Sequence, residues 1–149
     1  MYKRQVYLKS GIGFHSNDAR IIATGTTEDL LPKARGIDLG TVWKPTPKTW
    51  IEATWWYLHL EQEFVYVGDE GIVEPSGRTR RLGIDLSLRY QLHKYLFLDG
   101  DVNYTYARAI DEPTGQDFIP LAPSFTSSGG LAFLHPKGIS ACSIPIFKR

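Results

Sequence analysis

Cysteine is nearly absent from this sequence, and so are long apolar runs and an excess of charge of either sign. The single cysteine, Cys142, excludes an internal disulfide and a cysteine-based metal site. No run of about 18 apolar residues occurs, so we expect no transmembrane helix. With 17 Lys and Arg against 16 Asp and Glu, the chain has no global basic field, and we expect no nucleic-acid partner.

The most informative stretch runs from Thr79 to Arg108, with a tight turn near His93. Apolar and polar side chains alternate along both of its arms. The apolar row includes Leu82, Ile84, Leu86, Leu88, Leu96, Leu98 and Val102, and the polar row includes Arg81, Asp85, Arg89, Asp99, Asp101 and Asn103. A period of two that continues on both sides of a turn predicts a long β-hairpin.

The length of the arms bears on which solvent each row meets. Strands in soluble domains average about 5–6 residues, whereas a strand that crosses a bilayer needs roughly 9–11. Tyr90 and Tyr95 bracket the turn, and Tyr104 and Tyr106 end the apolar row, as in the aromatic girdles of outer-membrane barrels. We therefore expect the apolar row to face lipid and the polar row to face the lumen.

Two other architectures stay open at this point. Alternation alone does not distinguish lipid from a protein core, so a soluble β-barrel or sandwich that binds a ligand is one alternative. A small closed outer-membrane barrel with a structural role is the other.

Turn-forming clusters divide the rest of the chain into further strands. We expect strands at residues 5–14, 36–44, 50–67 and 125–133, and the start of another at Ile139. Long connections (15–34, 68–77 and 110–123) alternate with short ones (45–48, 92–94 and 135–138). Outer-membrane barrels have this asymmetry, with short periplasmic turns and longer extracellular loops. Trp43 and Trp50 flank a short turn and are expected to form an aromatic row at one height.

These patterns together predict an all-β fold. The expected form is an antiparallel, up-and-down transmembrane β-barrel segment of about six to seven strands, which is too few for the closed barrel of a large transporter.

Several short segments then carry a family resemblance. They are Gly13-Phe14-His15-Ser16-Asn17-Asp18-Ala19-Arg20, Ala34-Arg35-Gly36, Phe64-Val65-Tyr66-Val67-Gly68-Asp69, Glu74-Pro75-Ser76-Gly77-Arg78, Arg80-Arg81-Leu82-Gly83 and Ile119-Pro120-Leu121-Ala122-Pro123. In this order they resemble the barrels of TonB-dependent outer-membrane receptors, over roughly residues 5–141. The resemblance implies strands from the later part of a barrel of about 22 strands in the bacterial outer membrane. It also implies uptake of a scarce ligand, such as an iron–siderophore complex or cobalamin, with TonB supplying energy through an N-terminal plug.

The sequence departs from that family in several respects. It shows no plug, no TonB-contacting segment and no signal peptide, because no apolar region follows Lys3 and Arg4. From about Cys142 the tail abandons the strand pattern, and Pro145 cannot donate to a β-ladder. We therefore expect residues 1–149 to be a partial receptor barrel domain, from a truncated or frameshifted reading frame, that is inactive alone.

No catalytic or cofactor site is expected. His15, Ser16 and Asp18 are the residue types of a hydrolytic triad, but neighbours on an extended chain point to different sides. His59 and His135 lie far apart in the sequence, so no metal cluster is visible and no cofactor is predicted.

A polar cluster at the start of the first long loop is the one candidate ligand-binding site. It consists of His15, Asn17, Asp18 and Arg20. We interpret it first as a polar rim that satisfies backbone groups, with contact to a ligand as the less favoured interpretation.

The charged residues of the hairpin have separate expected roles. The polar row is predicted to keep the lumen wall hydrated or to hold a plug, with Arg89 opposite or diagonal to Asp99. Arg80 and Arg108 have the parity of the apolar row but lie at the long-loop ends of their strands. We hypothesise that both meet lipopolysaccharide phosphates of the outer leaflet; snorkelling toward water is the alternative.

Overall fold

The computed structural model describes residues 3–14, 31–67, 72–75, 77–119, 122–143 and 145–148. Within these ranges the regular structure is all β. The strands are β1 (Arg4–Phe14), β2 (Lys33–Trp43), β3 (Thr49–Leu60), β4 (Phe64–Val67), β5 (Ile72–Pro75), β6 (Thr79–His93), β7 (Leu96–Ala109), β8 (Phe125–Leu134), β9 (Ser140–Ser143) and β10 (Ile146–Lys148). The described residues contain no helix that is long and apolar enough to cross a membrane.

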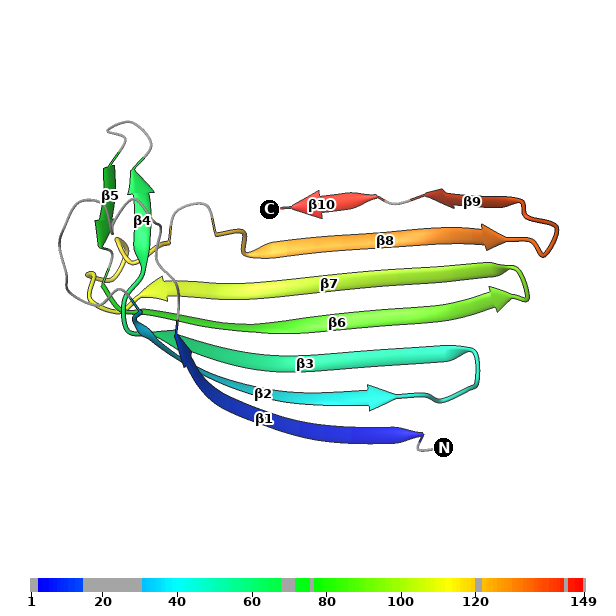
Figure 1. Cartoon of the computed structure of the whole chain (residues 1–149), viewed down its shortest axis with the longest axis horizontal. Helices are drawn as coiled ribbons and strands as arrows, with labels where there is room; N and C mark the ends of the chain where they lie inside the picture. Colours follow the sequence, from blue (N-terminus) through cyan, green and yellow to red (C-terminus); the bar gives the residue numbers. More distant parts are fainter. Residues whose placement is uncertain are drawn as a thin grey trace.

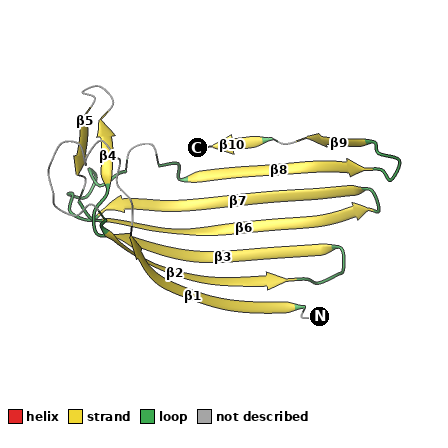
Figure 2. Ribbon diagram, in the orientation of Figure 1, coloured by secondary structure: helices red, strands yellow, loops and turns green. Residues whose placement is uncertain are grey.

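The long strands form one antiparallel sheet in chain order. Its order is β1-β2-β3-β6-β7-β8, and β9 and β10 both pair with the outer edge of β8. Figure 1 and Figure 2 show these strands side by side in a single curved layer, with the β4–β5 hairpin standing apart at one end. The predicted all-β, up-and-down, incomplete barrel is confirmed.

The connections are sorted by length between the two ends of the sheet. Short turns join β2 to β3, β6 to β7 and β8 to β9 at one end, which we call the short-turn end (Figure 1). The longer connections from β3 to β6 and from β7 to β8 lie at the opposite, long-loop end.

The central hairpin has the register that its alternation requires. Thr79 pairs with Ala109, Leu86 with Val102 and Arg89 with Asp99. Each of these pairs sums to the same even number, so both arms present their apolar side chains on one face. The register shifts between Gln91 and His93, next to the turn.

The predicted end of the third strand is wrong. It was expected to run from residue 50 to residue 67, but β3 ends at Leu60 and a separate hairpin of β4 and β5 follows. Glu61 and Glu63 interrupt the alternation there, and the Glu63 carboxylate turns back to bond Thr79 and Arg81. The expected loop over residues 68–77 contains β5.

The tail also differs from expectation. Instead of losing its strand pairing, it returns along β8 in two short pieces, β9 and β10. β9 ends at Ser143 and β10 begins at Ile146, directly after Pro145, which has no N–H to donate. The Pro145 carbonyl still accepts a hydrogen bond from the Gly129 amide at 3.2 Å.

The two faces of the sheet differ in chemistry and in exposure. The apolar face carries Leu8, Leu39, Trp55, Ile84, Leu86 and Val102, and the polar face carries Tyr7, Asp38, Glu52, Thr54, Asp85, Ser87, Asp101 and Asn103. Leu86 is 46 % exposed, whereas Asp101 and Asn103 are half-buried. Among the described hydrophobic residues only Leu60 and Ala107 are buried. A soluble sheet buries its apolar face, so this distribution is the reverse of a soluble fold.

Candidate functional site: the polar face and its two ends

A glycine on β2 makes room for the aromatic side chain of Tyr7 on the polar face of β1. A Cβ atom at Gly40 would collide with the ring of Tyr7. The Tyr7 ring therefore lies across β2, and its hydroxyl reaches β3 to bond Glu52 at 2.9 Å and Thr54 at 2.7 Å. One side chain thus ties together three neighbouring strands.

An aromatic side chain also packs over a glycine between β3 and β6. At Gly83 a Cβ would collide with the indole of Trp56 and with the Tyr104 carbonyl oxygen. Trp56 therefore belongs to the polar face, although Trp55 and Tyr57 beside it belong to the apolar face.

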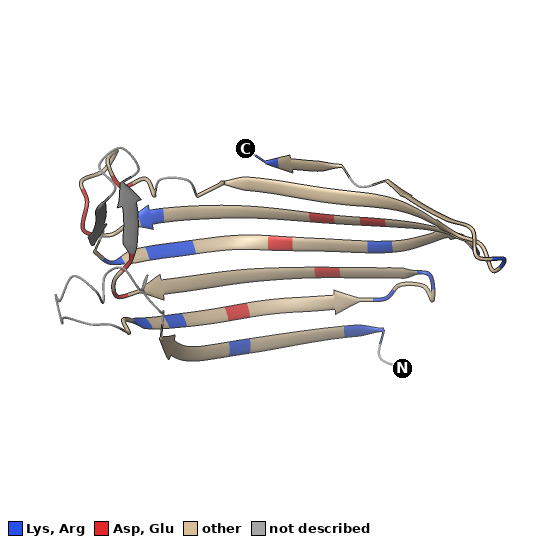
Figure 3. Ribbon diagram, turned by 45° about the horizontal axis from the view of Figure 1, so that its top comes forward, with Lys and Arg blue, Asp and Glu red and all other residues tan. Residues whose placement is uncertain are grey.

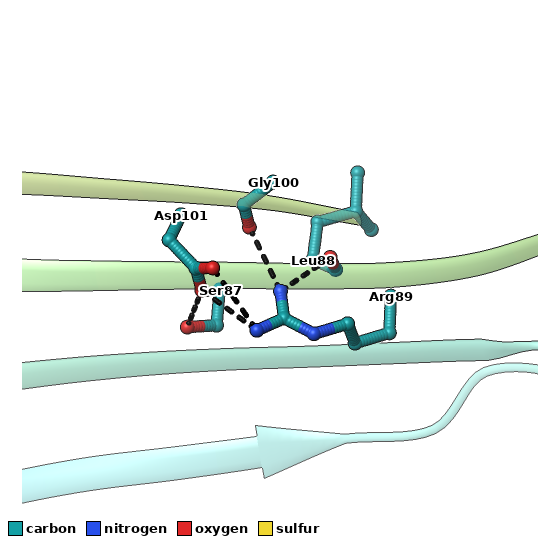
Figure 4. A network of polar contacts seen from close by, with 5 residues as sticks. All are labelled: Ser87, Leu88, Arg89, Gly100 and Asp101. Atoms are coloured by element: carbon teal, nitrogen blue, oxygen red, sulfur yellow. Dashed lines mark hydrogen bonds and ion pairs between the residues drawn. The ribbon is translucent and has the colours of Figure 1, made fainter. Parts of the chain in front are cut away.

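The middle of the polar face is a network between β6 and β7 (Figure 4). The Ser87 hydroxyl donates to Asp101 at 2.6 Å, and the Arg89 guanidinium binds both oxygens of the same carboxylate at 3.0 Å. The other terminal nitrogen of Arg89 donates to the carbonyl oxygens of Leu88 and Gly100, at 2.9 and 3.2 Å. The guanidinium is thus held in one orientation by one terminal nitrogen that bonds both carboxylate oxygens and by two backbone acceptors of the other.

The register and the side-chain partner of Arg89 differ. Its Cα is opposite Asp99, but its guanidinium binds the diagonal Asp101. Asp99 instead lies close to the Cα of Gly130 on β8. Arg89 and Asp99 are therefore opposite each other in the strand register, as predicted, but the ion pair of Arg89 is with Asp101.

A second group of polar contacts lies toward the long-loop end. The Asn103 amide donates to the Asp85 carboxylate, and the Thr105 hydroxyl donates to the Asn103 oxygen at 2.9 Å. Further along, the Arg81 guanidinium is paired with Glu63. All six residues of the predicted polar row therefore share one face, and all of them except Asp99 are paired across neighbouring strands or with Glu63.

At the long-loop end an ion pair clamps β6 to the connection after β7. Arg78 donates to Asp111 through its amide at 2.9 Å and through its guanidinium at 2.6 Å. The hydrogen bond from the Arg78 side chain, and to a smaller extent the one from its amide, holds the pKa of the Asp111 carboxyl below its usual value. The Ile110 amide in turn donates to the Arg78 carbonyl at 2.8 Å, so the two segments are fixed together.

At the short-turn end the polar face is hollowed. A concave region of about 620 Å³ is lined by Lys44, Lys48, Trp50, Arg89, Phe97 and Asp99, among others. Arg89 lies over the Trp50 ring, with 6.0 Å from its central carbon to the ring centroid. The hollow is rich in cations and suits an anionic group.

The two tryptophans expected in an aromatic row at this end lie at one height but on opposite faces of the sheet. Trp50 pairs with Arg89 and lies on the polar face, whereas Trp43 pairs with Ile51 and lies on the apolar face. The two tryptophans flank the same turn from opposite faces, because residues paired between β2 and β3 have numbers that sum to 94, so Trp43 lies opposite Ile51 and not Trp50.

The remaining predicted residues fall into two groups. Leu82, Ile84, Leu86, Leu88, Leu96, Leu98 and Val102 share the apolar face. His15, Asn17, Asp18 and Arg20 lie outside the described residues, so the candidate ligand site stays a prediction.

Comparison with known families identifies the chain. The family model described as TonB dependent receptor-like, beta-barrel matches residues 5–139. A comparison with curated proteins gave no match. That family consists of outer-membrane receptors with a transport function, and it is not a family of enzymes. The open antiparallel sheet, with short turns at one end and long connections at the other, has the form of part of such a barrel. The chain belongs to the TonB-dependent receptor β-barrel family of the outer membrane.

Proposed function

We propose that this chain forms part of the wall of an outer-membrane receptor that takes up a scarce ligand, of the iron–siderophore or cobalamin class. In such a receptor TonB supplies the energy and a plug domain fills the barrel. The observation that supports this most is the reversed sheet: the apolar face is exposed and the polar face is hydrogen-bonded within itself.

The two faces take their roles from this proposal. Leu82, Ile84, Leu86, Leu88, Leu96, Leu98 and Val102 face lipid, and Arg81, Asp85, Arg89, Asp99, Asp101 and Asn103 face the lumen. The long-loop end would then be extracellular. His15, Asn17, Asp18 and Arg20 follow β1 in the sequence and remain a candidate polar rim, with contact to a ligand as the less favoured interpretation.

The polar networks suit a lumen wall because they are nearly self-sufficient. Asp101 is bound by Ser87 and Arg89, and Asp85 by Asn103, so these charges need no partner from a protein core. Carboxylates paired in this way tolerate either water or a plug against them.

The open sheet supports a further proposal, that these residues do not act alone. It is open, with β1 at one edge and the β8–β10 pairing at the other. In lipid an unpaired backbone N–H or C=O costs several kcal/mol, so an open edge disfavours stable insertion. We therefore propose that the polypeptide by itself neither inserts stably in cells nor transports.

Solubility and membrane recovery test this proposal together. The chain is expected to aggregate in buffer, to dissolve in uncharged detergent, and to give no protease-resistant, heat-modifiable band in membranes of cells that express only these residues. A freely soluble monomer with protected leucines would overturn the membrane assignment. A resistant, heat-modifiable band would overturn only the dependence on further strands.

A further inference from the structure

Four basic side chains form a row across four neighbouring strands at the long-loop end. Arg35 on β2 pairs with His59 on β3, His59 with Arg80 on β6, and Arg80 with Arg108 on β7. Neighbouring strands are about 4.8 Å apart, so this basic row extends over roughly 14 Å. Figure 3 shows basic residues gathered at this end of β2, β6 and β7.

The basic row lies on the apolar face, just beyond the apolar band. Two residues along each strand, toward the short-turn end, the next row on the same face contains Tyr57, Leu82 and Tyr106. Tyrosines at this position are typical of the interface between hydrocarbon and headgroups. The basic side chains are therefore placed at headgroup height, where a cation on the lipid side costs only about 0–1 kcal/mol.

The acidic groups near the row already bind arginines other than Arg80, two of them in the row itself. Glu61 pairs with Arg35 at 3.0 Å, and Asp117 pairs with Arg108 at 3.3 Å. Asp111, on the connection after β7, is bound by Arg78 at 2.6 Å.

Arg80 is left as the surplus cation of the row. Its side chain is exposed, and it makes no hydrogen bond or ion pair within the described part of the chain. A planar guanidinium binds a phosphate through two parallel hydrogen bonds, which fix the orientation of the phosphate.

Arg108 supplies a fixed second cation beside it. Its guanidinium lies between two rings, 4.2 Å from the centroid of Tyr106 and 4.0 Å from that of Phe118. The row thus combines one held and one free guanidinium at opposing positions of adjacent strands.

We propose that the basic row binds the phosphorylated sugar headgroup of lipid A, the outer-leaflet glycolipid, with Arg80 as its main phosphate contact. The acyl chains then run down the apolar face along Leu82, Ile84 and Leu86. A bisphosphorylated disaccharide suits the two neighbouring guanidinium groups of Arg80 and Arg108 better than a single phosphate does, because its charges are spread along its length. The inference rests on the proposed function, since it requires the long-loop end to be extracellular.

Arg80→Gln is the variant that tests this site, and Arg4→Gln is the matched control. Arg4 has the same charge and lies at the short-turn end, where it stacks on Trp43 with 5.7 Å to the ring centroid. In dodecylmaltoside micelles, bisphosphorylated lipid A bound to the full chain is counted by native mass spectrometry. One arginine at an anionic surface contributes about 1 kcal/mol, so Arg80→Gln should weaken lipid A binding about fivefold. Arg4→Gln should bind as the wild type does.

Each other outcome has a defined meaning. Equal affinities of the two variants, as simple snorkelling of Arg80 predicts, would overturn the lipid A site. The same holds if phosphatidylglycerol or inorganic phosphate competes as well as lipid A does. If the wild-type chain is instead a soluble monomer that ignores micelles, the proposed function fails together with this inference.

Discussion

Replacing Leu86 by arginine tests which solvent the apolar face meets. Leu86 is 46 % exposed and pairs with Ala53 and Val102, both on the same face. The eight residue-to-residue steps from Leu82 to Tyr90 cover about 27 Å of strand, or about 21 Å along the membrane normal at a tilt of about 40°. Leu86 is at the middle of that span and therefore near the centre of the apolar band, which is about 25 Å thick.

The expected cost follows from that depth. An arginine on the lipid face of a barrel costs roughly 2–4 kcal/mol at the midplane, which lowers the folding equilibrium constant about 30- to 700-fold. The matched control is Ser128→Arg, because Ser128 lies on the polar face and pairs with Asp101. A new cation beside that carboxylate should change the free energy of unfolding by less than about 1 kcal/mol.

Because the open sheet is not expected to insert stably by itself, both variants are made in a complete receptor barrel that contains these strands. Urea unfolding of that barrel in lipid bicelles measures them, with tryptophan fluorescence as the signal. The account predicts that Leu86→Arg is destabilised by about 2 kcal/mol or more relative to Ser128→Arg. It also predicts no cooperative transition for any of the proteins in lipid-free buffer. A larger loss for Ser128→Arg would show that the faces are inverted. A cooperative transition in buffer, with Leu86→Arg the weaker protein there, would show that the leucines lie in a soluble core.

Three further perturbations have defined outcomes in the same bicelles. Gly40→Val should displace the Tyr7 ring and cost about 1–3 kcal/mol of unfolding free energy; a tyrosine fluorescence and stability equal to the wild type would contradict the close contact. Asp101→Ala should cost about 1–3 kcal/mol, because it leaves its arginine partner without a carboxylate, and an unchanged urea midpoint would exclude a stabilising role for the network. The Asp111 pKa is lowered in the folded chain, so the clamp to Arg78 is complete above the unfolded pKa and is lost as pH falls through the folded value. Protection of the Arg78 amide from hydrogen exchange, relative to Asp111→Asn at each pH, should fall on acidification, and a constant ratio would contradict this.

The central hairpin could be predicted from sequence because its alternation is strict. Between Thr79 and Ala109 nearly every second residue is apolar, and register follows from parity once the turn is placed. Over β3 the alternation fails, since Trp55, Trp56 and Tyr57 are consecutive. The strand itself was found, but the break after Leu60 and the hairpin beyond it were not.

The polar contacts were predictable only as a shared face. The bonds from Tyr7 to Glu52 and Thr54 join residues 45 and 47 positions apart, across an intervening strand. Their one signal in the sequence is a glycine, Gly40, whose register with Tyr7 becomes known only in the sheet. The choice of Asp101 by Arg89, over the directly opposite carboxylate, likewise depends on side-chain rotamers rather than on spacing.

Quenching by brominated lipid tests the central claim most directly. In a Cys142→Ser background, a fluorescent probe is attached to a cysteine introduced at Leu86 or at Ser87, which point to opposite faces of β6. The account predicts strong quenching of the probe at position 86 by lipid brominated near the middle of its acyl chains, and weak quenching at position 87. Equal quenching, or stronger quenching at position 87, would contradict the assignment of the apolar face to lipid.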